Sequence, residues 1–176
     1  MIRIIASEWR KLRRPTLFLG TMGAVIANSA LFSTLLFLLI DSPRGNSERG
    51  RMVTRESLSS AHGVVQGFTS VAGLLGIIAL CVFAAQTAQE YTYGTLRNLL
   101  VRQPRRIFLL VGKHVAMSIF ALVMVLLAAT SSILAELYFA PKKNVSTQLW
   151  FDADGKHYIL QSFGNVLLAT ILYGTV

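Results

Sequence analysis

The chain has 176 residues, of which 53% are hydrophobic and 14% are charged, and it carries a formal net charge of +9. This balance and a mean hydropathy of +0.56 exclude a soluble globular protein of this length. The sequence therefore predicts an all-α integral membrane protein, a polytopic helical bundle preceded by an amphipathic helix at its N-terminus.

The first fourteen residues, 1–14, are predicted to form that helix in the membrane interface. Hydrophobic residues recur at helical spacing on one face, and basic residues lie on the other. A frayed basic tail is one alternative. A cleaved signal peptide is another, because small residues occur at 27–30, but the apolar run continues to Ile40 and is too long for a signal-peptide core. The expected anchors at headgroup depth are Trp9, Arg10 and Lys11.

Four apolar stretches are long enough, or nearly so, to cross a bilayer. A hydrocarbon core of about 30 Å needs about 20 helical residues. We place the spans at 16–40, 64–86, 115–137 and 158–176. The whole chain, 1–176, is thus predicted to be a single transmembrane domain. The bundle is expected to be incomplete at its C-terminal end, because the fourth span stops without a polar anchor.

Few polar residues lie inside these spans. We expect them to form hydrogen bonds between helices, with a translocation path as the alternative, and small-residue pairs at Gly23 with Ala27 and at Gly63 with Gly67 to allow close packing. Glu136 is the one acid within a proposed span. Because it lies near the end that faces the third loop, it is expected to need no buried partner.

A short polar and amphipathic segment, 90–106, separates the second span from the third. Gly94 allows a sharp turn, Thr95 is suited to cap a helix, and Pro104 ends it. Such a helix is too short to span lipid and can fit a groove in another protein, although its leucines could instead dip into lipid. Its apolar stripe is Leu96, Leu99 and Leu100, with Arg97, Asn98 and Arg102 pointing elsewhere.

The basic residues near the span ends predict the orientation. Ten Lys and Arg residues flank the spans on the side of the N-terminus and the 90–106 segment, against seven on the opposite side. The N-terminus and this segment are therefore predicted to be cytoplasmic. The positive charge fits contact with anionic headgroups rather than with nucleic acid, and Lys113 is expected to begin the third span and reach lipid phosphates.

The residue inventory argues against an enzyme. A phosphate-binding loop would need Gly-Lys-Ser or Gly-Lys-Thr, but Gly112-Lys113 is followed by His114. His62, His114 and His157 lack the close spacing of metal ligands. Cys81 is the single cysteine and cannot form an intrachain disulfide. We therefore expect no catalytic residue, cofactor or metal in this chain.

The 90–106 segment resembles the first cytoplasmic loop of type-two (ABC-2 type) permease subunits of ATP-binding cassette (ABC) transporters. The matching residues are Glu90, Gly94-Thr95-Leu96-Arg97, Leu99-Leu100, Pro104, Arg106 and Gly112-Lys113, and the opening helix of that family resembles Ser7-Glu8-Trp9-Arg10-Lys11. The remainder of the chain matches by its pattern of spans. The resemblance implies a fold of typically six membrane helices, so two further helices would follow Val176.

In this family the loop docks on a separate cytoplasmic ATPase. The resemblance therefore implies an ATP-driven exporter of the plasma membrane that pairs with an ABC ATPase and with a second permease copy or homologue. ATP and Mg²⁺ would bind to the ATPase. Membrane lipids are a further expected partner, and nucleic acid is not. The implied docking residues are Glu90, Tyr91, Tyr93, Gly94, Thr95, Leu96, Arg97, Leu99, Leu100, Arg102, Pro104 and Arg106.

A second function fits the same sequence. The chain could be a membrane anchor or sensor that does not transport and that recruits a cytoplasmic protein through the same segment. Nucleotide-dependent flux in vesicles separates the two functions.

Overall fold

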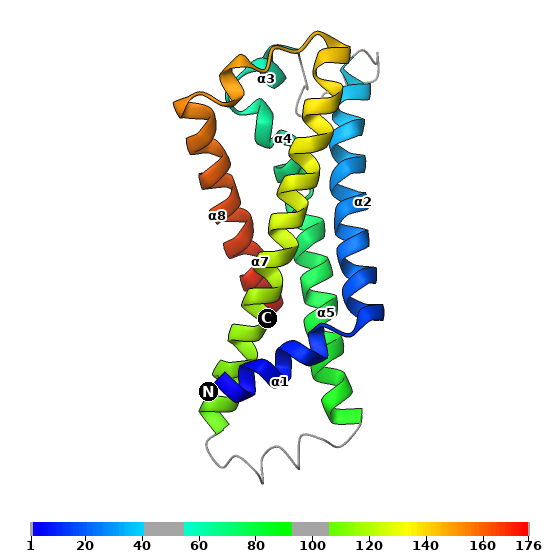
Figure 1. Ribbon diagram of the computed structural model, residues 1–176, viewed down its shortest axis with the longest axis vertical. Coiled ribbons are helices and arrows are strands. Elements are labelled where there is room, and N and C mark those ends of the chain that lie inside the picture. Colours follow the sequence, from blue (N-terminus) through cyan, green and yellow to red (C-terminus); the bar gives the residue numbers. More distant parts are fainter. Residues whose placement is uncertain (1, 41–54, 93–105, 176) are drawn as a thin grey trace.

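The structure, a computed structural model, describes residues 2–40, 55–92 and 106–175. Within these ranges every element is a helix, and the long helices lie along the long axis of the molecule (Figure 1). The predicted all-α helical bundle is therefore confirmed. In chain order the elements are α1 (Ile2–Leu12), α2 (Pro15–Leu39), α3 (Arg55–Ser59), α4 (Gly63–Ser70), α5 (Ala72–Thr92), α7 (Arg106–Phe139), η2 (Pro141–Lys143), η3 (Gln148–Trp150) and α8 (Ala153–Thr175).

Three helical segments in the described ranges are long and apolar enough to cross a membrane. They are Pro15–Leu39, Gly63–Gln89 and Leu110–Phe139, whereas α8 has 23 residues and is not among them. Large apolar side chains point outward from these helices, such as Leu19 at 70% and Leu134 at 66% exposed. Apolar surface of this extent suits hydrocarbon rather than water, as expected of a multi-pass membrane protein.

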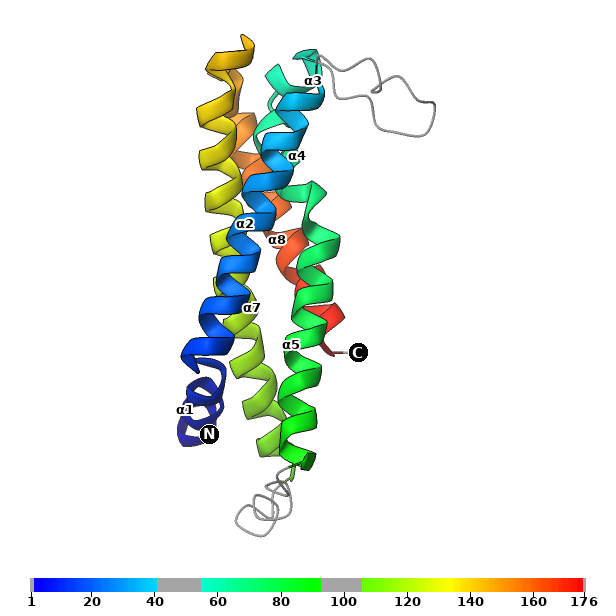
Figure 2. The same cartoon turned by 90° about the vertical axis from the view of Figure 1, so that its right-hand side faces the viewer.

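The helix α7 is central to the bundle. α1, α2, α4 and α8 all pack against it, and α2 runs beside it in the same direction (Figures 1 and 2). α5 instead packs mainly against α8. α7 starts at Arg106, well before the predicted start of the third span at 115, because no Pro and only one Gly occur between its ends. Lys113 therefore lies about two turns inside α7 rather than at its beginning.

The second predicted span, 64–86, is interrupted by a break that was not predicted. α4 ends at Ser70 and α5 starts at Ala72, with Val71 between them. Ser70 Oγ donates to the carbonyl of Gln66 at 2.7 Å, and Thr69 Oγ1 donates to the same oxygen at 3.2 Å. Hydroxyl groups that bond backbone carbonyls in this way bend helices. The two helices nevertheless follow one another along the bundle as a single membrane segment.

Buried side chains form two hydrophobic clusters. The larger surrounds Phe120 and Met124 of α7 and extends to Leu12 of α1. The second lies at the end of the bundle remote from α1, where Trp150 of η3 is fully buried (Figure 1). Trp150 Nε1 donates to the carbonyl oxygen of Leu58 in α3 at 2.8 Å. This bond ties the short helices to one another over the end of the long ones.

Replacing Trp150 with Ala is expected to lower the free energy of unfolding by about 3 to 5 kcal/mol, because it leaves a cavity where the indole was buried. It also leaves the Leu58 carbonyl without its donor. Thermal unfolding in detergent micelles measures the loss. Phe151→Ala is the control, since Phe151 is 50% exposed and its removal should cost less than about 1 kcal/mol. Equal losses in the two variants would contradict this role of Trp150.

Candidate functional site

The predicted docking segment, 90–106, is held at both ends by helices that stop at the same end of the bundle. α5 finishes at Thr92, α7 begins at Arg106, and α1 lies across α7 at this end (Figure 1). Tyr91, in the last turn of α5, is 68% exposed. Glu90 belongs to the same turn. The other predicted docking residues lie outside the described ranges: Tyr93, Gly94, Thr95, Leu96, Arg97, Leu99, Leu100, Arg102 and Pro104.

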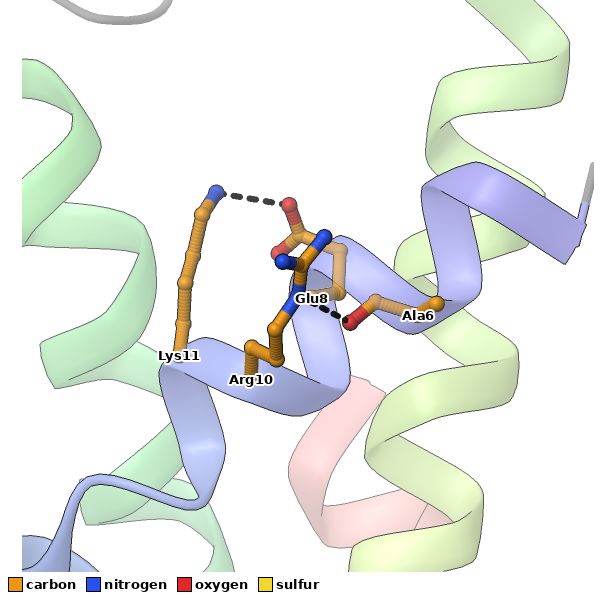
Figure 3. A network of polar contacts seen from close by, with 4 residues as sticks. All are labelled: Ala6, Glu8, Arg10 and Lys11. Carbon is orange, nitrogen blue, oxygen red and sulfur yellow. Dashed lines mark hydrogen bonds and ion pairs between the residues drawn. The ribbon is translucent and has the colours of Figure 1, made fainter.

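The amphipathic helix α1 packs on the bundle through its apolar residues. Leu12 is 3% exposed, and the half-buried Trp9 packs against the same hydrophobic cluster. Arg10 is exposed, and its Nε donates to the carbonyl of Ala6 at 3.3 Å (Figure 3). A helix that packs its apolar face on the protein and leaves a basic side chain exposed is suited to the level of the lipid headgroups. Anchoring by Trp9, Arg10, Lys11 and Lys113 stays a prediction.

Polar side chains from α1, α5 and α7 meet in a narrow crevice at this end. Glu8 is buried, and its Oε1 accepts a hydrogen bond from Lys11 Nζ at 2.6 Å in an ion pair along α1 (Figure 3). Gln86 of α5 is 5% exposed. The residues that line the crevice are Glu8, Leu12, Gln86, Lys113, Ala116 and Met117, and they leave no room for a water molecule. The crevice thus joins the N-terminal helix to the two helices that hold the 90–106 segment.

A second polar cluster is buried between α2, α4 and α7. Oε1 of Glu136 lies 3.0 Å from the backbone nitrogen of Gly67, 3.3 Å from Ser132 Oγ and 3.5 Å from Ser33 Oγ. The two serine hydroxyls are themselves 2.7 Å apart. Glu136 is 1% exposed, and among the described residues its Oε2 has no hydrogen-bond partner. One carboxyl oxygen therefore holds three helices together.

This cluster corrects the expectation that Glu136 needs no buried partner. α2 and α4 pack against this part of α7, so a residue near the end of α7 is enclosed between helices rather than open to water. The expected close packing at Gly67 pointed to part of this cluster. A Cβ atom added there would collide with Ser33 Oγ and Glu136 Oε1, so glycine permits the close approach that was expected of it. At Gly23, by contrast, an added Cβ meets no atom of this chain within 4 Å.

One family comparison covers almost the whole chain. The family model described as "ABC-2 family transporter protein" matches residues 4–174. The match includes α1 from its third residue, the 90–106 segment, α2 through α7, and α8 up to Gly174. No curated protein and no solved structure matches the chain.

Gly67→Ala is expected to destabilise the chain by about 1 to 3 kcal/mol, because the added methyl group forces Ser33 and Glu136 apart from the backbone of α4. Gly164→Ala is the matched control, since a Cβ atom at Gly164 meets nothing within 4 Å. Thermal unfolding of the two variants in the same detergent gives the comparison. Unchanged stability of Gly67→Ala would show that the contact with Glu136 is not tight.

Proposed function

The chain belongs to the ABC-2 family of transporter proteins and is a membrane permease component of an ABC transporter, and on that premise we propose that it is an exporter driven through the 90–106 segment by a separate ATPase subunit. The family implies a partnership with such an ATPase. The observation that carries the assignment is the match over residues 4–174.

The placement of the segment ends supports docking there. Because α5 and α7 both deliver the chain to the end of the bundle where α1 lies, the 90–106 segment is tethered at two points beside the membrane surface. In this proposal Leu96, Leu99 and Leu100 fill a groove of the ATPase, and Arg97 and Arg102 pair with acidic groups at its rim. Force applied to the segment reaches α5 and α7 directly.

The energy requirement is within the reach of such a contact. Changing a conformational balance from 1:99 to 99:1 takes about 5.5 kcal/mol of differential binding. An ATPase that closes on ATP and Mg²⁺ can supply this difference, because it grips the segment differently in its open and closed states. We assign the nucleotide and the metal to the ATPase and no catalytic step to this chain.

The remaining features of the proposal follow from the topology. A cytoplasmic ATPase requires the N-terminus and the 90–106 segment to face the cytoplasm, which agrees with the distribution of basic residues. A second permease copy would cover part of the apolar surface of the bundle, and lipid would cover the rest. The exposed Arg10 of α1 would then meet anionic headgroups.

The double variant Leu99→Asp, Leu100→Asp is expected to release the ATPase in a detergent pull-down, because each buried apolar anchor contributes about 2 kcal/mol or more. The control is Asn98→Asp, Gln103→Asp, which adds the same charge away from the leucine stripe and should keep the ATPase bound. Full recovery with the leucine variant would refute docking. Recovery of an ATPase whose hydrolysis rate the chain leaves unaltered would favour a membrane anchor over a transporter.

Cysteine labelling in intact cells tests the orientation. In a Cys81→Ala background, Asn98→Cys is expected to resist a membrane-impermeant maleimide, because the proposal places it in the cytoplasm. Ser146→Cys should react, since Ser146 is exposed and lies between η2 and η3, in the segment that joins α7 to α8 at the opposite end of the bundle. Labelling of Asn98→Cys from outside would exclude contact with a cytoplasmic ATPase.

A further inference from the structure

The break between α4 and α5 has the local geometry of a hinge. Val71 has φ −91° and ψ −2°, and its N–H donates to the carbonyl of Phe68, three residues earlier, at 3.3 Å. The usual bonding resumes at Leu75, whose N–H donates to the carbonyl of Val71 at 3.0 Å. One tightened turn inside a membrane-spanning segment is a place where two helices can change their mutual angle with few lost hydrogen bonds.

The two sides of this break pack differently. α4 lies against α7, α2 and α8, whereas α5 lies mainly against α8 and makes little contact with α7. Figures 1 and 2 show that α4 is at the end of the bundle remote from α1, and that α5 continues from there to the end where α1 lies. The break therefore separates a half that packs on α2 and α7 from a half that has little contact with either.

Glu136 fastens α4 to α2 and α7. Its Oε1 accepts from the backbone N–H of Gly67, in the middle of α4, and lies within hydrogen-bonding distance of one serine on α2 and one on α7. Gly67 has no side chain to hold these groups apart. The hydrogen bond from Trp150 Nε1 to the carbonyl oxygen of Leu58 joins η3 to α3, the helix that precedes α4 in the chain. α5 has no comparable buried carboxyl bond to α7 in the described ranges.

We propose that Val71 is the pivot of the transport movement, and that Glu136 is the positioning residue that keeps α4 fixed on α2 and α7 while α5 tilts relative to α7. The driving force rests on the proposed function, since α5 ends at the segment assigned to the ATPase. If α4 and α5 formed one rigid helix, a tilt at one end would also move the other end. A break at Val71 with one half latched confines the movement to the half nearer the cytoplasm.

Distances between spin labels test the pivot in the full chain with Cys81→Ala, reconstituted with its co-purified ATPase. One label pair, at Thr69 and Leu134, joins α4 to α7, and a second pair, at Gln89 and His114, joins α5 to α7; all four residues are exposed. The label at Thr69 removes the longer of the two hydroxyl bonds to the Gln66 carbonyl and keeps the 2.7 Å bond from Ser70. On trapping with ATP and vanadate, we expect the second distance to change by about 2 Å or more and the first to stay unchanged. Equal changes in both distances, or a change in the first alone, would overturn the pivot.

Variants of Glu136 test the latch in the chain alone, without the ATPase. Glu136→Gln keeps an oxygen acceptor and should retain a narrow Thr69–Leu134 distance distribution, whereas Glu136→Leu should broaden it. Ser132→Ala removes one contact to the carboxyl and should broaden the distribution in the same sense. Ser131→Ala is its control, because Ser131 Oγ bonds only within its own helix, to Ala128, among the described residues. A distribution that stays narrow in both Glu136→Leu and Ser132→Ala would overturn the latch.

Nucleotide trapping of the same variants separates positioning from simple support of the fold. With Glu136→Leu, trapping should now shift the Thr69–Leu134 distance as well, and Glu136→Gln should restore the wild-type pattern. A general loss of stability would not make the Thr69–Leu134 distance depend on nucleotide. If no ATPase co-purifies, the proposed function fails, and the measurements on the chain alone still decide the latch. If Glu136→Leu does not fold, Ser132→Ala with its Ser131→Ala control decides it.

Discussion

In hydrocarbon, buried polar groups must find their partners inside the protein, and the carboxyl group of Glu136 meets that demand across three helices. Its Oε1 accepts from the N–H of Gly67 in α4 and lies within hydrogen-bonding distance of Ser33 in α2 and Ser132 in α7. The arrangement of α4 against α2 and α7 depends on a carboxyl group that reaches the backbone of α4 where glycine leaves it accessible.

The opposite end of the bundle is organised around α7 and α1. The extended start of α7 brings Lys113 beside Glu8 and Gln86, in a crevice that α1, α5 and α7 line together. The 90–106 segment joins two of these helices, α5 and α7. In the proposed function, a subunit bound there would pull on α5, which has little contact with α7, and the force would pass along α5 toward Val71.

Several features were predictable because they depend on local patterns. The first three apolar stretches gave the helical membrane segments, since hydropathy over about 20 residues reports the cost of exposing polar groups to lipid. Spacing in 1–14 gave α1, and the motif at 90–106 led to the family that the match over 4–174 shows. The break at Val71 was not predicted, because Thr and Ser residues such as Thr69 and Ser70 also occur in unbroken helices. Glu136 was misjudged, because its distance along the chain from a loop said nothing about what covers it.

Local patterns of residues were enough to predict the class of the protein, its membrane helices and its family, because the bilayer imposes one requirement on every residue of a span and the predicted docking motif is contiguous. Tertiary structure alone decided which helices share partners and where polar groups meet. Ser33, Gly67 and Glu136 are far apart in the chain, and their contact exists only because α2, α4 and α7 pack together. Such contacts depend on the relative position of three helices, a quantity that no local pattern of residues contains.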